Sequence, residues 1–310
     1  MGIKPKVLLT GGRGMVGRNI LEHPLAEQFS FLAPTRSELD LRDFLRVRDY
    51  VAFHLPEYVI HTAGLVGGIQ ANMANPVNFL VENVDLGRNV ILASRDVGVK
   101  NLLNLSSSCM YPRYASNPLT EDLILKGELE PTNEGYALAK IFATRLCEYL
   151  HKEDSSLKYK TLVPCNLFGR FDKFDPKHSH LIPAIIHKVH LAKVMQEKKV
   201  EIWGDGTARR EFMYAGDLAD FVLKAILNFD QIPHLMNVGQ GFDYCINEYY
   251  QAVADVVGWN GLFIHDLTKP VGMQQKLVSI DLQRAWGWQA PTSLKEGITK
   301  SYNFYLKSTQ

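Results

Sequence analysis

The stretch Val7-Leu-Leu-Thr-Gly-Gly-Arg-Gly-Met-Val-Gly17 decides the fold of this chain. It is typical of a short apolar strand, a glycine turn and the start of a helix. Gly11, Gly14 and Gly17 have the spacing of a dinucleotide-binding turn, in which glycines permit positive φ, close approach to a pyrophosphate and tight helix–strand packing. The phosphates would lie at the N-terminus of the helix, where free amides favour anions. The alternative is a glycine turn without a ligand, but its position directly after a strand favours nucleotide binding.

Strands and helices alternate after this turn up to about residue 169, as in a parallel sheet covered on both faces. The pattern then becomes less regular, with a polar loop at 171–180, a basic amphipathic helix at 181–199 and a single short strand at 208–214. We therefore predict an α/β protein with a doubly wound parallel (Rossmann) sheet and a smaller, discontinuous α/β substrate-binding domain. The predicted domains are residues 1–169 plus 213–240 for the nucleotide, and 170–212 plus 241–310 for the substrate.

Two arginines indicate which dinucleotide would bind. A protein that prefers NAD usually has an acidic residue at the end of the second strand, for the ribose 2′-hydroxyl. Here that strand, expected at 29–36, ends at Arg36, and Arg13 lies inside the glycine turn. Two guanidinium groups suit a 2′-phosphate, so NADP(H) is the predicted cofactor, although two solvated arginines are the alternative. Asp40 could accept a hydrogen bond from the adenine amino group, or it could cap the next helix.

A tyrosine and a lysine four residues apart form the candidate proton donor. Tyr136 and Lys140 would share one face of a helix, about 5–6 Å apart at Cβ. A Lys charge about 6 Å away, at an effective dielectric of about 20, would favour the phenolate by about 2.8 kcal/mol, or two pKa units. The pair is therefore predicted to act in general acid–base catalysis. The spacing alone is common on amphipathic helices, so the prediction depends on the strands around it.

Composition excludes several classes of protein. The formal net charge of +1 gives no reason to expect nucleic acid or an anionic membrane as a partner. The sequence has no apolar run long enough to cross a membrane and no secretory signal at its start. Its four cysteines have neither disulfide nor zinc-site spacing, which indicates a reducing, cytoplasmic location and no metal.

Several stretches together resemble a known family. The turn at 10–17 with Ser107, Tyr136 and Lys140 is similar to the extended branch of the short-chain dehydrogenase/reductases. Residues 66–69, 106–112, 130–140, 180–193 and 203–212 resemble, more narrowly, the GDP-L-fucose synthase family, and the likeness extends from residue 6 to about 305. Cys109 and His180 are the part of this likeness that is specific to the epimerising members.

The resemblance implies a role for each of these residues. Tyr136 would protonate the alkoxide formed when hydride reaches a C-4 ketone, Ser107 would hold that oxygen, and Lys140 would bind the nicotinamide ribose. Cys109 and His180 would act as base and acid on opposite faces of the sugar, because a free thiol and a free imidazole titrate on either side of neutrality. Without the resemblance, a buried cysteine and a loop histidine are the ordinary interpretations. The implied cofactor contacts are Gly11, Arg13, Gly14, Met15, Val16, Gly17, Arg36, Asp40, Ala63, Lys140 and His180.

The implied substrate is a GDP-sugar. Asn166, Lys188, Trp203, Arg210 and Lys269 are the implied contacts, with Arg210 suited to a diphosphate and Trp203 to stacking on guanine. The expected reaction is NADPH-dependent 3,5-epimerisation and 4-keto reduction of GDP-4-keto-6-deoxy-D-mannose. Departures from the family pattern at Gly64, Cys165, 169–174 and Val271 leave the exact sugar open, including a colitose-type dideoxy sugar or a heptose.

Two other classes of protein remain as alternatives, a sugar 4-epimerase with bound NAD and a non-catalytic NADP sensor. The two arginines argue against the first and the complete Ser107, Tyr136 and Lys140 set against the second. Extended members of this family usually pair two helices of each subunit, so a homodimer is expected, with the helix after Asn75 and the helix carrying Tyr136 at the interface.

Overall fold

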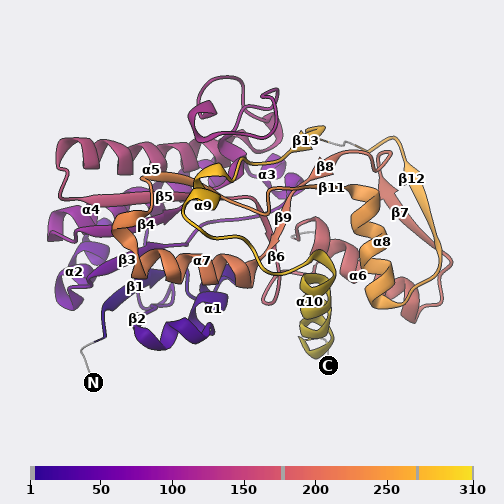
Figure 1. Ribbon diagram of the computed structural model, residues 1–310, viewed down its shortest axis with the longest axis horizontal. Coiled ribbons are helices and arrows are strands. Elements are labelled where there is room, and N and C mark those ends of the chain that lie inside the picture. Colours follow the sequence, from indigo (N-terminus) through magenta and orange to yellow (C-terminus); the bar gives the residue numbers. More distant parts are fainter. Residues whose placement is uncertain (1–3, 176–178, 270–271, 309–310) are drawn as a thin grey trace.

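A six-stranded parallel sheet forms the larger part of the molecule (Figure 1). The computed structural model describes residues 4–175, 179–269 and 272–308. The strands lie in the order β10-β5-β4-β3-β1-β2, and every neighbouring pair is parallel, which confirms the predicted doubly wound sheet. Their bounds are β1 (Lys6–Thr10), β2 (Ser30–Leu32), β3 (Tyr58–His61), β4 (Asn101–Leu105), β5 (Lys158–Pro164) and β10 (Leu235–Val238).

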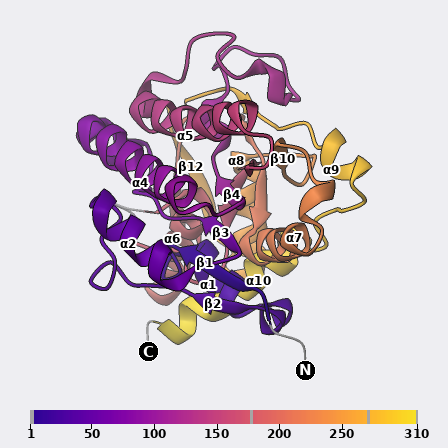
Figure 2. The same cartoon turned by 90° about the vertical axis from the view of Figure 1, so that its left-hand side faces the viewer.

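Helices cover both faces of this sheet, which explains why its strands are mostly apolar on both sides. In β1, Val7 and Leu9 belong to one buried cluster and Leu8 to another, because successive side chains point to opposite faces. Figure 2 shows the two layers, with α1 (Met15–Leu21) and α7 (Ala215–Leu227) on one face. The other face carries α2 (Phe44–His54), α4 (Pro76–Val97) and α5 (Glu134–Glu153).

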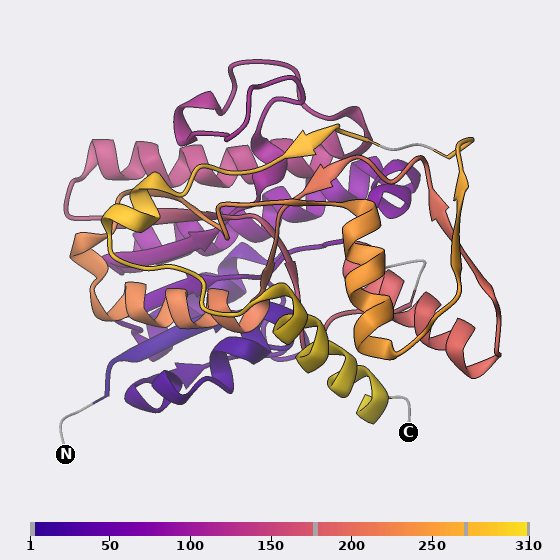
Figure 3. The ribbon, with the colours of Figure 1, turned by 45° about the vertical axis from the view of Figure 1, so that its right-hand side comes forward.

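The smaller part of the molecule has its own core. Helices α6 (Leu181–Val194), α8 (Ile246–Val257) and α10 (Leu294–Ser308) pack beside β7 (Lys199–Trp203) and β12 (Leu262–Asp266), as Figure 3 shows. Their buried side chains, among them Ile186, Val253 and Ile298, form one cluster that is separate from the two around the large sheet. No helix within the described residues is long and apolar enough to cross a membrane.

Short strands connect the two parts. One sheet joins β8 (Arg209–Arg210), β11 (Tyr244–Cys245) and β13 (Gln275–Lys276), and another joins β6 (Asn166–Phe168) and β9 (Phe212–Tyr214). The remaining helical segments are α3 (Ile69–Ala74), α9 (Asp281–Ala285) and the 3-10 turns η1 (Pro24–Gln28), η2 (Ser108–Met110), η3 (Glu121–Leu123), η4 (Pro131–Asn133) and η5 (Phe229–Gln231). Val278, Ile280 and Trp288 pack in the core of the large sheet although they follow residue 241, where we expected only the second domain.

Three predicted elements have different bounds. The second strand, expected at 29–36, ends at Leu32, because Pro34 has no amide hydrogen with which to continue the ladder. The helix expected at 181–199 ends at Val194. Gln196, two residues later, has a positive φ of 57°, which a helix does not continue through, and β7 begins at Lys199. The single strand expected at 208–214 is broken at Glu211, since its two halves pair in different sheets.

Candidate active site

The glycine turn leaves β1 in the conformation that the sequence predicts. Gly11 has a φ of +74°, and a Cβ there would lie 2.7 Å from the backbone nitrogen of Ala63. At Gly17 a Cβ would lie 2.3 Å from the carbonyl oxygen of Gly11, so this glycine allows α1 to pack against the turn. At Gly14, in contrast, the one atom within 4 Å of an added Cβ is that same oxygen, at 3.3 Å. The turn therefore presents open backbone at Gly14, flanked by the half-buried Met15 and Val16.

Charged side chains gather where β2 ends. The exposed Arg36 lies 3.5 Å from a carboxylate oxygen of Glu82. Hydrogen bonds from Thr35 lower the pKa of Glu38, and the Arg13 charge lowers it slightly further. Asp40 binds the guanidinium of Arg42 through both oxygens, which holds the pKa of Asp40 well below its usual range. The alternative that Asp40 caps the next helix is wrong, because Asp43 is the N-cap of α2.

The end of β4 and the start of α5 bring the predicted catalytic groups together. Ser107 caps η2 by accepting from the amide of Cys109, and it also hydrogen-bonds to the phenol of Tyr136. One turn further along α5, the ammonium of Lys140 donates to the carbonyl of Leu105 at 3.0 Å and lies 5.7 Å from the centre of the Tyr136 ring. The structure thus places Ser107, Tyr136 and Lys140 at one edge of the sheet.

The pKa of Tyr136 is a correction to the sequence prediction. Burial raises the pKa of the phenol above its ordinary value, the charge of Cys109 raises it further, and the Ser107 hydrogen bond lowers it by less. Burial also lowers the pKa of Lys140 to about 8. We expected the lysine to dominate, but both groups lie in a low-dielectric environment that opposes charge on either of them.

Cys109 lies beside this set, and its partners were missed by the sequence reasoning. Its sulfur accepts a hydrogen bond from Asn133 Nδ2 at 3.2 Å, and Lys276 Nζ lies 3.6 Å away. Asn133 ends η4, directly before α5, and its Oδ1 is buried with no hydrogen-bond partner in the described part of the chain. Asn133 stands inside a stretch that the sequence analysis quoted, whereas Lys276 had no local signal, being one lysine in a two-residue strand.

His180 is the N-cap of α6 and is half-buried. Burial lowers its pKa, and the positive charges of Lys276 and Lys173 lower it further. The neighbouring Ser179 carbonyl would lie 3.1 Å from a Cβ at Gly68, in the loop that leaves β3. Loops of the large sheet, the start of α6 and β13 therefore converge, and they bring His180 into the electrostatic range of the lysine that contacts Cys109.

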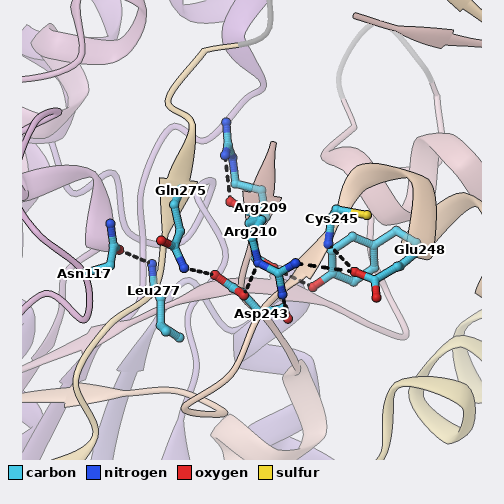
Figure 4. Close-up of polar contacts among 9 residues, drawn as sticks. Asn117, Arg209, Arg210, Asp243, Cys245, Glu248, Gln275 and Leu277 are labelled. Atoms are coloured by element: carbon cyan, nitrogen blue, oxygen red, sulfur yellow. Dashed lines mark hydrogen bonds and ion pairs between the residues drawn. The ribbon is translucent and has the colours of Figure 1, made fainter. Parts of the chain in front are cut away.

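Arg210 lies in the same three-stranded sheet as Lys276, and Figure 4 shows its contacts. In β8 it is the register partner of Lys276, and its guanidinium donates to the Arg209 carbonyl at 2.8 Å. Arg209 is held by Asp243 at 2.7 Å, and the same carboxylate accepts from Gln275 at 2.7 Å. Burial lowers the pKa of Arg210, which leaves a desolvated guanidinium at the junction of the two parts.

Three other predicted substrate residues form a group around β7. Lys269 Nζ lies 5.6 Å from the centre of the Trp203 ring, which is 42% exposed. Lys188 donates to the carbonyl of Glu201 at 2.8 Å, and the Trp203 indole donates to the side chain of the same residue. The structure therefore brings Trp203 and Lys269 into contact, while Lys188 reaches the strand from α6.

Asn166 lies deeper, where its side chain donates to the carbonyl of Glu211 at 2.9 Å. Cys165 is buried, and Gly64 is the position where an added Cβ would lie 3.7 Å from Lys140 Nζ. Val271, where we noted the loss of a family aspartate, lies outside the described residues.

The residues present fit a phosphorylated dinucleotide. The open backbone at Gly14 can accept a pyrophosphate at close range, and Arg13 and Arg36 supply cationic donors beside it, although carboxylates accompany both. Lys140 and Tyr136 lie at the adjoining strand end, where a nicotinamide ribose would reach them. No cluster of His, Cys, Asp or Glu suited to a metal ion occurs among the described residues.

Comparison with known proteins agrees with this geometry. The model of the NAD dependent epimerase/dehydratase family matches residues 7–239. A GDP-L-colitose synthase of Yersinia pseudotuberculosis is 52% identical over 301 residues, which cover 97% of this chain and 98% of that protein. A GDP-L-fucose synthase of Azorhizobium caulinodans is 48% identical over 310 residues, which cover 100% of this chain and 99% of that protein.

A solved structure extends the comparison to a bound cofactor. The GDP-mannoheptose C4 reductase MlghC of Campylobacter jejuni, with NADP bound, superimposes with a TM-score of 0.88 at 32% identity, and 99% of each chain is covered. The names of these three relatives refer to different GDP-sugars, namely GDP-L-colitose, GDP-L-fucose and GDP-mannoheptose.

Proposed function

Since the chain belongs to the NAD dependent epimerase/dehydratase family and is an NADP-dependent epimerase-reductase of the GDP-L-fucose synthase type, we propose that it converts GDP-4-keto-6-deoxy-D-mannose to GDP-L-fucose. The observation that carries the proposal is the position of Cys109 beside the Tyr136 and Lys140 pair, with His180 within electrostatic range of the lysine that contacts the sulfur. A reductase without an epimerisation step has no need of this thiol and imidazole.

The epimerisation steps would use Cys109 and His180. The C-4 ketone acidifies the protons at C-3 and C-5, so a thiolate can remove one of them while an imidazolium returns a proton to the other face. The electron pair of the C–H bond moves toward the ketone oxygen, where Ser107 and Tyr136 can donate hydrogen bonds to the oxyanion. The lowered pKa of His180 makes its protonated form a stronger acid.

The reduction step would use the same oxygen. NADPH supplies the hydride to C-4, and Tyr136 gives its proton to the developing alkoxide. Ser107 holds that oxygen and the phenol in one hydrogen-bonded unit. Lys140 is anchored by the Leu105 carbonyl, so its ammonium keeps a fixed distance from the phenol. We propose Asn166, Lys188, Trp203, Arg210 and Lys269 as the contacts to the GDP-sugar.

One experiment separates the possible reactions. The protein is incubated with NADPH and GDP-4-keto-6-deoxy-D-mannose in deuterated water, and the product is analysed by mass spectrometry and NMR. Deuterium at both C-3 and C-5, with oxidation of NADPH, is the result expected of the full reaction. A product protiated at both centres would contradict the proposal and indicate simple C-4 reduction.

A colitose-type substrate is a second candidate, because the identity to the GDP-L-colitose synthase, 52%, is higher than that to the GDP-L-fucose synthase, 48%. A 3,6-dideoxy sugar has no stereocentre at C-3, so inversion at C-5 alone would complete its epimerisation. Comparing kcat/KM for GDP-4-keto-6-deoxy-D-mannose and its 3-deoxy analogue decides between the two. A preference for the analogue of tenfold or more would replace the first proposal by this one.

We also propose that two copies of the chain pair through α4 and α5. The solvent-facing surface of these helices exposes large apolar side chains, which a second copy would cover. They are Val77, Val81, Leu138, Phe142 and Tyr149, with exposed fractions between 38% and 69%. Two helices from each copy would form a four-helix bundle, the packing that the family resemblance implies.

A further inference from the structure

The sulfur of Cys109 is held from two directions. Asn133 Nδ2 donates to it at 3.2 Å, and the ammonium of Lys276 lies 3.6 Å away, within hydrogen-bond distance for sulfur. Both partners are N–H donors, and one of them carries a full positive charge. Such surroundings favour a thiolate over a thiol, because the anion accepts both hydrogen bonds more strongly and is attracted by the ammonium.

Lys276 is a built-in part of the site rather than a surface lysine that happens to reach the sulfur. It is only 9% exposed. The residues around it are each fixed by a hydrogen bond: Gln275 to Asp243, Leu277 to Asn117 (Figure 4), and the amide of Val278 to Glu211 at 3.0 Å. These bonds fix the backbone on both sides of Lys276, and burial restricts the rotamers that are open to its side chain.

We propose that Lys276 is a positioning residue for Cys109, which keeps the sulfur anionic and aimed at the sugar during epimerisation. The proposal rests on the proposed function only in taking Cys109 as the base. In the step itself the sulfur takes a proton from carbon and becomes a thiol, and His180 delivers a proton to the opposite face. Lys276 neither gains nor loses a proton, so the atoms and charges balance without it.

The other charged groups around the sulfur do not replace this lysine. Tyr136 and Lys140 both interact electrostatically with Cys109, but Lys140 donates to the Leu105 carbonyl and Tyr136 is an uncharged phenol while it remains protonated. His180 would itself be the acid of the reaction. Among the described residues, Lys276 is the cation for which a hydrogen bond to this sulfur is recorded.

The test measures the thiolate directly, without substrate. Iodoacetamide reacts with thiolates, so the rate at which Cys109 is alkylated, followed by peptide mass spectrometry between pH 6 and 9, reports how much thiolate is present. We expect Lys276→Gln to slow alkylation about tenfold at pH 7 and to shift the rise of the rate to higher pH. Lys276→Arg, which keeps the charge, should restore most of the rate.

A matched control uses another lysine of the same region. Lys269→Gln removes a cation next to Trp203 and should leave the alkylation rate of Cys109 in the substrate-free protein unchanged, since the contacts of Lys269 are with Trp203 and Asp266 rather than with the sulfur. Equal rates in the wild type, Lys276→Gln and Lys269→Gln would overturn the proposal. So would a Lys276→Gln variant whose only defect is a raised KM, because Lys276 would then be a contact to the diphosphate.

The assay also separates this proposal from the function on which it rests. If the wild type incorporates no deuterium from solvent into the GDP-sugar, the proposed function fails, yet the alkylation rates still decide what Lys276 does to Cys109. If deuterium is incorporated, Lys276→Gln should lower that incorporation by tenfold or more. Incorporation at the wild-type rate in a folded Lys276→Gln variant would overturn the inference.

Discussion

Two glycines of the same turn should fail in opposite ways when replaced by alanine. At Gly14 an added Cβ meets only the Gly11 carbonyl, at 3.3 Å, and φ is −76°, which any residue can adopt. The cost to folding should therefore stay below about 1 kcal/mol, with some of it offset by the lower entropy of the unfolded chain. The methyl group would, however, project from the backbone at which a pyrophosphate must approach, so NADPH binding should weaken tenfold or more, about 1.4 kcal/mol.

At Gly17 the geometry is different. A Cβ would lie 2.3 Å from the Gly11 oxygen and 2.6 Å from the Gly12 Cα, both of them backbone atoms that cannot rotate away. Relieving this contact requires α1 to move off the turn, at a cost of about 3 kcal/mol or more. Gly17→Ala should thus lose free energy of unfolding, whereas Gly14→Ala should keep it.

Urea unfolding and a fluorescence titration with NADPH measure the two effects on the same samples. The expected pattern is a stable Gly14→Ala protein that binds NADPH poorly and a destabilised Gly17→Ala protein. Unchanged NADPH affinity in Gly14→Ala would refute the reasoning about the pyrophosphate. Wild-type stability in Gly17→Ala would refute the reasoning about helix packing.

Three further predictions concern the phenol, a buried histidine and the subunit interface. Tyr136→Phe should lower the steady-state rate of NADPH oxidation with substrate by at least about 10²-fold, because the proton donor is lost, while NADPH affinity and stability stay unchanged. A smaller loss of rate would mean that another group supplies the proton. Burial lowers the pKa of His61 to about 3, so as the pH falls below 6.5 this histidine is protonated in the unfolded chain but not in the folded one. The free energy of unfolding should therefore drop by about 1.4 kcal/mol per pH unit between about pH 6 and 4. Urea unfolding of His61→Asn over the same pH range should lack this contribution to the slope. A Val81→Glu, Phe142→Glu double variant should elute as a monomer in size-exclusion chromatography with light scattering, and a wild-type protein that is itself monomeric would contradict the proposed interface.

Local sequence patterns were sufficient for the large sheet. The glycine turn follows β1 because only that order of residues permits both the φ of Gly11 and the close packing at Gly17. The helix α5 was likewise predicted from a local pattern, because its buried residues recur every three or four positions. Tyr136 and Lys140, four residues apart, therefore lie on one side of this helix. Both features depend on residues that are close in sequence, so the sequence alone is sufficient to predict them.

What the sequence did not predict depends on distant segments. Lys276 contacts a sulfur that is 167 residues away in the chain, and a two-residue strand has no period that could mark it. The direction of the Tyr136 pKa shift likewise follows from how much protein surrounds the phenol, which helical spacing does not contain. The break at Glu211 was missed because the pairing partners of β8 and β9 come from three other places along the chain, β6, β11 and β13.

The buried carboxylate of Glu211 has a consequence for exchanging parts among related enzymes. It accepts from the amides of Gln240 and Gly241 and, through its other oxygen, from that of Val278, directly beside the strands of Arg210 and Lys276. The segments around these substrate-side residues are therefore not one contiguous piece of chain that can be exchanged by itself. A chimera with a related enzyme would have to exchange the segments around Glu211, Gln240 and Val278 together. A chimera with a single crossover point would combine segments from two different proteins around the Glu211 carboxylate.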